Sequence, residues 1–189
     1  MKTKLLLLTL TLMFTTHSIA ADYKIDTKGM HASIQFKISH LGMSWIMGRF
    51  DSFTGDYSYD AEKPEEAKLN IVVDTKSVNT NHAERDIHLR GSDFLDVEKF
   101  PQATFVSESV TLNEDNTGTM TGKLNLHGVE KTITVDITKI GEGKDPWGGY
   151  RTGFDGTTTL KLADYGITKN LGKASETLEL IVTIEGKKQ

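Results

Sequence analysis

The sequence has no cysteine, fewer basic than acidic residues and no apolar run long enough to cross a membrane. Without cysteine, a disulfide framework, a thiol nucleophile and a cysteine-ligated zinc site are excluded. Residues 1–20 hold two lysines and no acidic residue, so residues 21–189 carry 20 Lys+Arg against 26 Asp+Glu, a net charge of −6. An acidic protein repels phosphate backbones and anionic membranes, so we expect no nucleic-acid partner and no stable membrane insertion.

The N-terminal segment has the pattern of a cleavable export signal. An apolar run of about ten residues from Leu5 follows two lysines and precedes a small residue at Ala20, whereas about 20 residues are needed to span a bilayer. No cysteine follows, which excludes a lipoprotein anchor. We therefore predict a signal peptide over residues 1–20, a periplasmic location, and one mature domain over residues 21–189.

Most of the remaining sequence consists of segments in which apolar and polar residues alternate, such as Ile133, Val135 and Ile137. Alternation with period two places every second side chain on one face of a strand. The segments are also rich in Thr, Val, Ile, Phe and Tyr, which favour extended backbone. We predict strands over residues 23–26, 32–40, 46–59, 68–74, 102–110, 118–127, 131–140, 150–162 and 176–186.

Eight of these strands are long enough to form a closed barrel, but a two-layer sandwich would show the same alternation. Gly55, Gly122 and Gly156 occupy inward positions, where glycine leaves room inside a barrel and eases strand curvature. The same glycines are equally expected at β-bulges. We predict the barrel, that is, an all-β fold of eight antiparallel strands with one or two short helices.

One segment breaks the alternation and predicts a short helix over residues 82–90. Asn81 suits the N-cap, and Gly91 suits the C-terminal end. Ala83 and Ile87 would share a face that either packs on the sheet or covers one mouth of the barrel. Two further predictions are a helical turn over residues 163–166 and a longer loop over residues 141–149.

Five segments carry a family resemblance, and they are Ala21-Asp22-Tyr23-Lys24-Ile25-Asp26, His40-Leu41-Gly42, Thr80-Asn81-His82-Ala83-Glu84-Arg85-Asp86, Phe100-Pro101-Gln102-Ala103-Thr104-Phe105 and Asp145-Pro146-Trp147-Gly148-Gly149. Together, and in this order, they resemble the YceI family of periplasmic proteins over essentially the whole mature chain. The resemblance implies a lipocalin-like barrel with an elongated apolar tunnel that takes polyisoprenoid lipids, such as a long-chain quinone or a polyprenyl phosphate. Other members are associated with amphiphiles such as fatty amides. No catalytic residues carry over.

The inward-facing residues of the predicted strands are almost free of charge. Ligand pockets are mostly apolar, with a few polar groups that orient one end of the ligand. An ordinary packed core would show the same alternation, and without the resemblance it is the favoured interpretation. With the resemblance, we predict that the tunnel wall consists of Ile34, Phe36, Ile38, Phe53, Tyr57, Leu69, Ile71, Val73, Phe105, Leu124, Leu126, Ile133, Val135, Ile137, Phe154, Leu160, Leu178, Leu180 and Val182.

Polar or aromatic residues in predicted loops, at strand ends or in the helix are candidates to hold a ligand's head group at a tunnel mouth. These candidates are His40, Trp45, Arg85, His88 and Trp147. Arg85 is the best charge partner for an anionic head, and its alternative role is local pairing with Asp86, Asp93 or Asp96. Trp147 is equally suited to covering the sheet as simple packing.

The sequence predicts neither a metal site nor a catalytic site. Four ligating side chains crowd residues 82–88, but only two of them can share a helix face, and zinc needs three or four ligands. The nucleophile-elbow, phosphate-loop and Rossmann patterns are missing. Paired carboxylates such as Asp22 and Asp26 are expected in exposed surroundings, where burial does not tune them for acid–base chemistry.

We therefore expect a periplasmic binding protein for a long-chain isoprenoid lipid, with the tail inside the barrel, the head at the rim and no cofactor. The alternatives are a lipid-processing enzyme that acts inside the barrel and a packed barrel that works through protein–protein contacts. A C2 homodimer is a common state for soluble proteins, but no residue in the sequence selects it.

Overall fold

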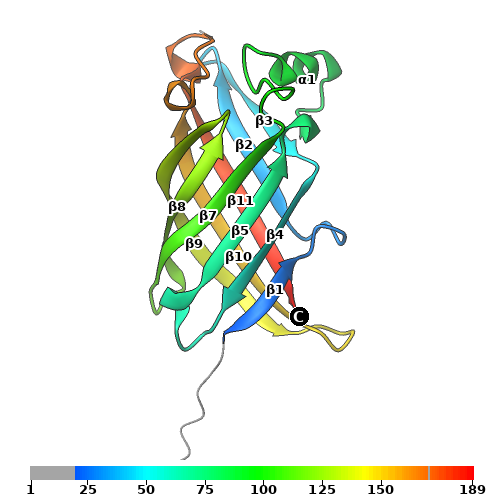
Figure 1. The fold of residues 1–189 in the computed structure, drawn as a ribbon, viewed down its shortest axis with the longest axis vertical. Coiled ribbons are helices and arrows are strands. Elements are labelled where there is room, and N and C mark those ends of the chain that lie inside the picture. Colours follow the sequence, from blue (N-terminus) through cyan, green and yellow to red (C-terminus); the bar gives the residue numbers. More distant parts are fainter. Residues whose placement is uncertain (1–19, 170) are drawn as a thin grey trace, which may run out of the picture.

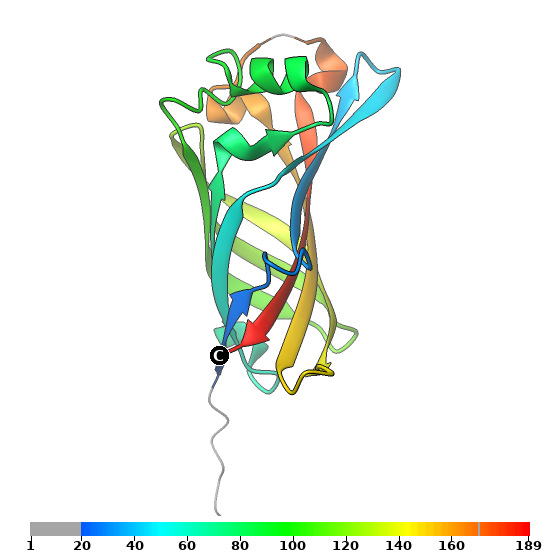
Figure 2. The same ribbon diagram turned by 90° about the vertical axis from the view of Figure 1, so that its right-hand side faces the viewer.

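A computed structural model describes residues 20–169 and 171–189 of the chain. These residues form a tall antiparallel barrel with a small cap at one end (Figures 1 and 2). We call the capped end, which carries the helix, the helix end, and the opposite end, where the C-terminus lies, the terminal end. Residues 1–19 of the predicted signal peptide fall outside the described residues, so that prediction stays untested.

Eleven strands make up the sheet within the described residues. They are β1 (Ala21–Ile25), β2 (Ser33–His40), β3 (Ser44–Phe50), β4 (Phe53–Tyr59), β5 (Lys68–Asp74), β6 (Val78–Asn79), β7 (Gln102–Leu112), β8 (Thr117–Leu126), β9 (Val129–Lys144), β10 (Tyr150–Lys161) and β11 (Thr177–Lys188). The helical elements are α1 (Ala83–Arg90) and four 3₁₀ turns, η1 (Pro64–Glu66), η2 (Thr75–Ser77), η3 (Leu162–Tyr165) and η4 (Lys173–Ser175).

The barrel closes because β1 pairs with β4 on one side and with β11 on the other. The closed ring runs β1-β4-β5-β7-β8-β9-β10-β11, so eight antiparallel strands surround the interior. The predicted all-β class and eight-stranded lipocalin-like barrel with short helices are therefore confirmed. In the described part of the chain, no helix combines the length and the apolar character that crossing a membrane requires.

The hairpin of β2 and β3 extends the wall at the helix end. There β2 takes the place of β1 beside β11, while β3 pairs with β6, which continues the line of β5. The prediction of one strand over residues 46–59 is therefore wrong, because Asp51 and Ser52 separate two strands with different partners. The Asp51 carboxylate fixes the bend by accepting hydrogen bonds from Arg49 at 2.6 Å and Asn79 at 2.7 Å.

A loop, the helix and one helical turn lie close to their predicted positions. The predicted loop over 141–149 shrinks to residues 145–149, because Gly141 and Gly143 continue β9 and pair with β10. The predicted helix is confirmed as α1, but its N-cap is His82, whose Nδ1 accepts from the Arg85 amide at 3.2 Å. Asn81 instead adopts a positive φ of 60°. The helical turn predicted near 163–166 is confirmed as η3.

The three glycines that suggested a barrel have three different surroundings. Gly156 lies on the wall of the interior cavity described below. Gly55 allows Ile25 to pack directly on the β4 backbone, since an added Cβ would lie 2.6 Å from Ile25 Cδ1. Gly122 pairs beside a bulge in β7, and the Phe105 ring lies over it. Both explanations that the sequence left open therefore apply, each to a different residue.

Aromatic rings fill the barrel near the terminal end. Tyr23 and Tyr57 stack with ring centroids 4.9 Å apart, and Phe154 meets Tyr57 and Tyr59 edge-on. The Tyr57 hydroxyl donates a 2.8 Å hydrogen bond to the Thr152 carbonyl, and burial raises the pKa of Tyr57, so the donor stays protonated. These rings therefore pack together on the side of β1, β4 and β10 at this end of the barrel.

A methyl group added at Gly186 is expected to disturb this aromatic packing. Its Cβ would overlap the Tyr57 ring and hydroxyl, so we expect Gly186→Ala to lower the free energy of unfolding by about 1–3 kcal/mol. Gly153→Ala is the matched control, because its Cβ would meet Ile140 Cβ at an ordinary 3.7 Å. Urea unfolding followed by circular dichroism measures both, and equal stabilities of the two variants would contradict the packing described here.

A cluster of charged side chains ties β1, β10 and β11 together at the terminal end. This charge cluster consists of Asp26, His31, Asp145, Arg151, Glu185 and Lys187. Arg151 lies at its centre and bonds Asp26 at 2.8 Å, Asp145 at 2.9 Å and Glu185. The expectation that Asp26 is exposed is wrong, since its side chain is only 4% exposed. Its partners lie far along the chain, which is why the sequence conceals the burial.

The charge cluster makes stability depend on pH in a defined direction. Burial alone would raise the pKa of Asp26, but hydrogen bonds from Arg151 and Lys187 outweigh it and hold the pKa well below its usual range. A depressed carboxyl pKa stabilises the fold above the unfolded-state value of about 3.9, and this contribution is lost as pH falls toward the folded-state pKa. We expect the stability difference between wild type and Asp26→Asn to be constant above about pH 5 and to shrink below about pH 4. Urea titrations across this range measure it, and a difference independent of pH would contradict the assignment.

Candidate functional site

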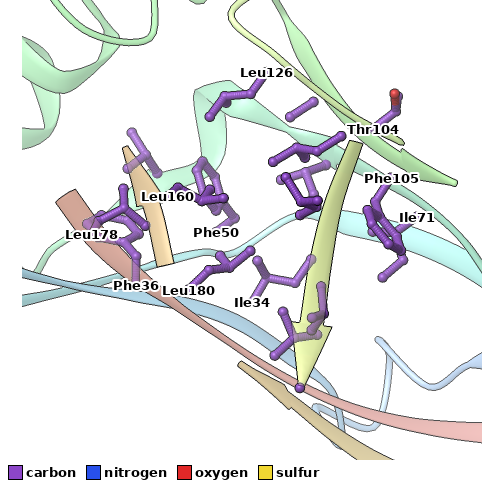
Figure 3. Close-up of a pocket in the computed structure, with 18 of the residues that line it drawn as sticks. Ile34, Phe36, Phe50, Ile71, Thr104, Phe105, Leu126, Leu160, Leu178 and Leu180 are labelled. Carbon is purple, nitrogen blue, oxygen red and sulfur yellow. The ribbon is translucent and has the colours of Figure 1, made fainter. Parts of the chain in front are cut away.

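The barrel encloses a large cavity that extends from the helix end to Tyr59, Pro64 and Leu112 near the terminal end. Its volume is about 770 Å³, within the range of roughly 300–1,000 Å³ for ligand pockets and several times the roughly 150 Å³ that accepts benzene in an engineered core. Figure 3 shows the wall, where the side chains drawn are almost entirely carbon. Strands from around the ring contribute, including Ile34 and Phe36 of β2, Ile71 of β5 and Leu178 and Leu180 of β11.

The wall contains every residue predicted for it except Phe53. Phe53 follows the bend at Asp51 and Ser52 and packs against the buried core without lining the cavity. Phe53 shares its face of β4 with Tyr57 and Tyr59, so the strand parity inferred from the alternation is the observed one. The part that these residues play in binding stays a prediction.

Several wall residues, such as Ile46 and Phe50 of β3, were not predicted from the sequence. These two line the cavity from even-numbered positions, whereas Tyr57 and Tyr59 of β4 line it from odd-numbered positions. The bend between β3 and β4 reverses the parity, which a single strand over 46–59 hides. Phe94 and Leu171 also line the cavity from irregular segments, where no periodic signal exists.

Two of the predicted head-group candidates, Arg85 and His88, lie on the cavity wall at the helix end. Arg85 is half-buried, and its guanidinium donates to the Thr80 hydroxyl at 2.7 Å and to the Thr80 carbonyl at 2.8 Å. Thr80 in turn donates to the buried Asp86 carboxylate through its amide at 2.9 Å. The direct pairing of Arg85 with Asp86, Asp93 or Asp96 is therefore not formed. Thr80 orients the arginine instead, and its charge is left beside the cavity.

The other three head-group candidates do not line the cavity. Trp45 is 63% exposed on the outer face of β3, because its neighbour Ile46 takes the inward position. His40 is exposed at the turn that follows β2. Trp147 is 79% exposed in the loop between β9 and β10, at the terminal end and thus far from α1 (Figure 1). Their residue types suit a head group, but their positions do not.

The cavity opens at the helix end between α1, the segment that follows it, and the loop between η3 and η4. Ile87 of α1 lines the cavity and is also 65% exposed, so α1 lies across the end of the barrel rather than on the sheet (Figure 2). This is the second of the two arrangements predicted for the helix. Asp93 and Lys169 both line the opening and form an ion pair of 2.5 Å between the two segments.

Two of the four ligating side chains of the helix region, His82 and Asp86, have structural roles. His82 caps α1 through its ring nitrogen, and Asp86 accepts hydrogen bonds from Thr80. Among the described residues, ligating atoms of Asp26, His31 and Glu185 lie within 4.8 Å of one another. Arg151 and Lys187 already contact these carboxylates, so their negative charge is neutralised by the protein itself.

A closed eight-stranded barrel around an apolar cavity with one capped opening is the architecture of a barrel that encloses a ligand. A family model described as a YceI-like domain matches residues 23–186, and the chain belongs to this family. The resemblance seen in the sequence motifs is thus confirmed.

Known proteins of similar sequence and structure agree with this assignment. A UPF0312 protein from Ectopseudomonas mendocina (strain ymp) is 56% identical over 172 residues, which cover 91% of this chain and 90% of the relative. The crystal structure of Burkholderia cenocepacia BcnA shares the fold with a TM-score of 0.75 at 21% identity, covering 85% of this chain and 98% of that one. A structure described as a polyisoprenoid binding domain from Saccharophagus degradans has a TM-score of 0.66 at 19% identity, covering 88% of this chain and 98% of that one.

Proposed function

We propose that this protein binds a long-chain amphiphilic lipid whose tail lies in the cavity of the barrel. The observation that carries the proposal is the apolar cavity of about 770 Å³ with an opening at one end. Burial of apolar surface contributes roughly 25 cal/mol per Å², so each isoprene unit enclosed contributes on the order of 3 kcal/mol. A long tail can therefore be held tightly without a specific contact along its length.

An isoprenoid is the proposed tail, of the quinone or polyprenyl phosphate type. The structural neighbour described as a polyisoprenoid binding domain and the membership of the YceI-like family support this choice. The proposed location is the periplasm, on the strength of the export-signal pattern in residues 1–20.

The proposed role is binding rather than catalysis. A reaction on an enclosed tail would need a titrating group buried beside it. Among the described residues, the buried part of the wall contains no carboxylate, histidine or lysine side chain. Its titratable groups are the phenols of Tyr57 and Tyr59, and burial raises the pKa of Tyr57, whose hydroxyl already donates to the Thr152 carbonyl. The ionisable groups at the opening, such as Arg85 and Lys169, are instead placed to meet a polar head.

Extraction of the purified protein with organic solvent, followed by mass spectrometry, tests the proposal. We expect one long-chain isoprenoid per protein chain, or uptake of added long-chain prenol by protein that was purified empty. A clean extract combined with no uptake would contradict the function. Chemical conversion of the added lipid would identify the protein as an enzyme instead.

We further propose that the head group lies at the helix end beside Arg85. A charge-assisted hydrogen bond to a phosphate contributes about 1.5–3 kcal/mol, so Arg85→Gln should weaken binding of geranylgeranyl phosphate by about tenfold or more and leave geranylgeraniol unaffected. Arg90→Gln is the matched control on the same helix, since Arg90 bonds the carbonyls of Lys76 and Val78 and does not line the cavity. Equal losses for phosphate and alcohol would contradict this placement.

A further inference from the structure

Exposed apolar side chains gather beside the opening of the cavity. The turn between β2 and β3 presents Leu41 and Met43, and Met43 is 85% exposed, while Trp45 follows at the start of β3. Ile87 of α1 and Leu171, from the loop between η3 and η4, are exposed at the same end. Figure 2 shows the turn projecting beside α1 at the top of the barrel. We call these five residues the apical patch. Contiguous exposed apolar surface of this kind marks an interaction site.

The elements that carry the apical patch are joined at the helix end. The hydroxyl of Ser175 in η4 donates to the Ser39 carbonyl at 2.7 Å, which joins the end of β2 to the segment that follows Leu171. Ile87 and Leu171 also line the cavity, so the patch continues into the apolar interior. A hydrocarbon chain can pass from a surface bound at the patch into the barrel without crossing water.

The charges around the apical patch are nearly balanced, whereas residues 21–189 as a whole have a net charge of −6. Residues 37–50 and 166–175 contain four Lys or Arg, of which Lys37, Arg49 and Lys169 form ion pairs with Glu179, Asp51 and Asp93. One of these cations, Lys37 Nζ, lies 4.8 Å from the centre of the Trp45 ring. A tryptophan flanked by lysine is suited to the boundary between hydrocarbon and phosphate head groups, where the ring is half-immersed and the cation meets phosphate.

From this combination we infer that the protein docks reversibly on a lipid bilayer through the apical patch, with the cavity opening facing the membrane. The inference rests on the proposed function, because a lipid-binding cavity gives the opening a reason to face its source of ligand. A second copy of the chain is a poorer occupant, since it offers no hydrocarbon chain that could pass through the opening into the cavity. A phospholipid surface offers apolar chains that can meet the patch and enter the cavity beside Ile87 and Leu171, which are exposed and also line it.

The two tryptophans of the chain lie at opposite ends of the barrel and report on the orientation. The Trp147→Phe variant keeps Trp45 as its single tryptophan, and the Trp45→Phe variant keeps Trp147. The probe is a vesicle of phosphatidylglycerol and dibrominated phosphatidylcholine, whose bromine quenches tryptophan inside the bilayer. We expect quenching of Trp45 in Trp147→Phe and none of Trp147 in Trp45→Phe. No quenching of Trp45, or quenching of both residues, overturns the proposed orientation.

A pair of methionine substitutions tests the apical patch itself. Met43→Glu should weaken vesicle binding in flotation assays by about tenfold, because it places a charge where an apolar side chain meets lipid. Met30→Glu is the matched control, since Met30 is 71% exposed in the loop between β1 and β2. Equal effects of the two changes overturn docking, and so does self-association through the apical patch in place of vesicle binding.

Lipid extraction from the same preparations separates this inference from the proposed function. We expect Met43→Glu to retain its co-purified lipid, because Met43 does not line the cavity. Wild-type protein that retains lipid but does not bind vesicles overturns the docking alone. Protein that binds vesicles through the apical patch with an empty cavity overturns the proposed function and leaves the docking standing.

Discussion

Val135→Trp is expected to remove most of the lipid that the protein retains while leaving the barrel folded. Val135 projects into the cavity from β9, opposite Met120 of β8 and next to Gly156 of β10. An indole at this position occupies the path of the tail, and each isoprene unit that it displaces removes on the order of 3 kcal/mol of binding free energy. Mass spectrometry of solvent extracts measures the ratio of lipid to protein.

The control for this substitution is Val106→Trp, which makes the same change on the outer face of β7, where Val106 is 49% exposed. It should leave lipid retention unchanged. Leu126→Trp provides a second test from β8 and should act like Val135→Trp, since Leu126 lines the same cavity. Retention of lipid by both wall variants would show that the tail lies elsewhere, provided that circular dichroism shows both to be folded.

Arg151→Met is expected to cause the largest loss of stability among surface substitutions, about 3 kcal/mol, because it removes the central cation of the charge cluster. Asp26 would stay almost fully buried with Lys187, His31 and the Gly29 amide as partners, and Asp145 would lose its bond to Arg151. Urea unfolding at neutral pH measures the change in the free energy of unfolding.

Arg49→Met is the matched control for Arg151→Met. Arg49 pairs with Asp51 at 2.6 Å, but both side chains are largely exposed, and exposed ion pairs contribute about 0–1 kcal/mol. The same change of residue type should therefore cost much less there. Similar losses for the two variants would show that Arg151 stabilises the barrel through packing of its side chain rather than through its charges.

The strands and the wall of the cavity could be predicted from sequence because both follow from local alternation. Ile133, Val135 and Ile137 face inward in β9 as their spacing indicates. The prediction fails where a distant residue decides the local backbone. The bend after β3 is held by Asn79, which lies 28 positions from Asp51 and gives no sign at the bend itself. The inward position of the missed Ile46 depends on that bend.

The cavity, the burial of Asp26 and the position of Trp147 could not be predicted from local patterns, because each depends on how distant parts of the chain come together. Alternation is the same for a packed core and for a hollow barrel, so the cavity emerges only once the ring closes with its actual register. The burial of Asp26 depends on Arg151, 125 positions away. Trp147 was predicted as a head-group candidate from its residue type and flanking glycines. The order of the strands, however, places its loop at the terminal end.

The pairing of β1 with β11 joins the first described strand to the last one, through contacts such as Tyr23 with Lys188. A ribosome must therefore release nearly the entire polypeptide before the ring can close. Until then, the growing chain has open strand edges and no sealed interior. A chain built in this order completes its closed fold only after its last strand has left the ribosome.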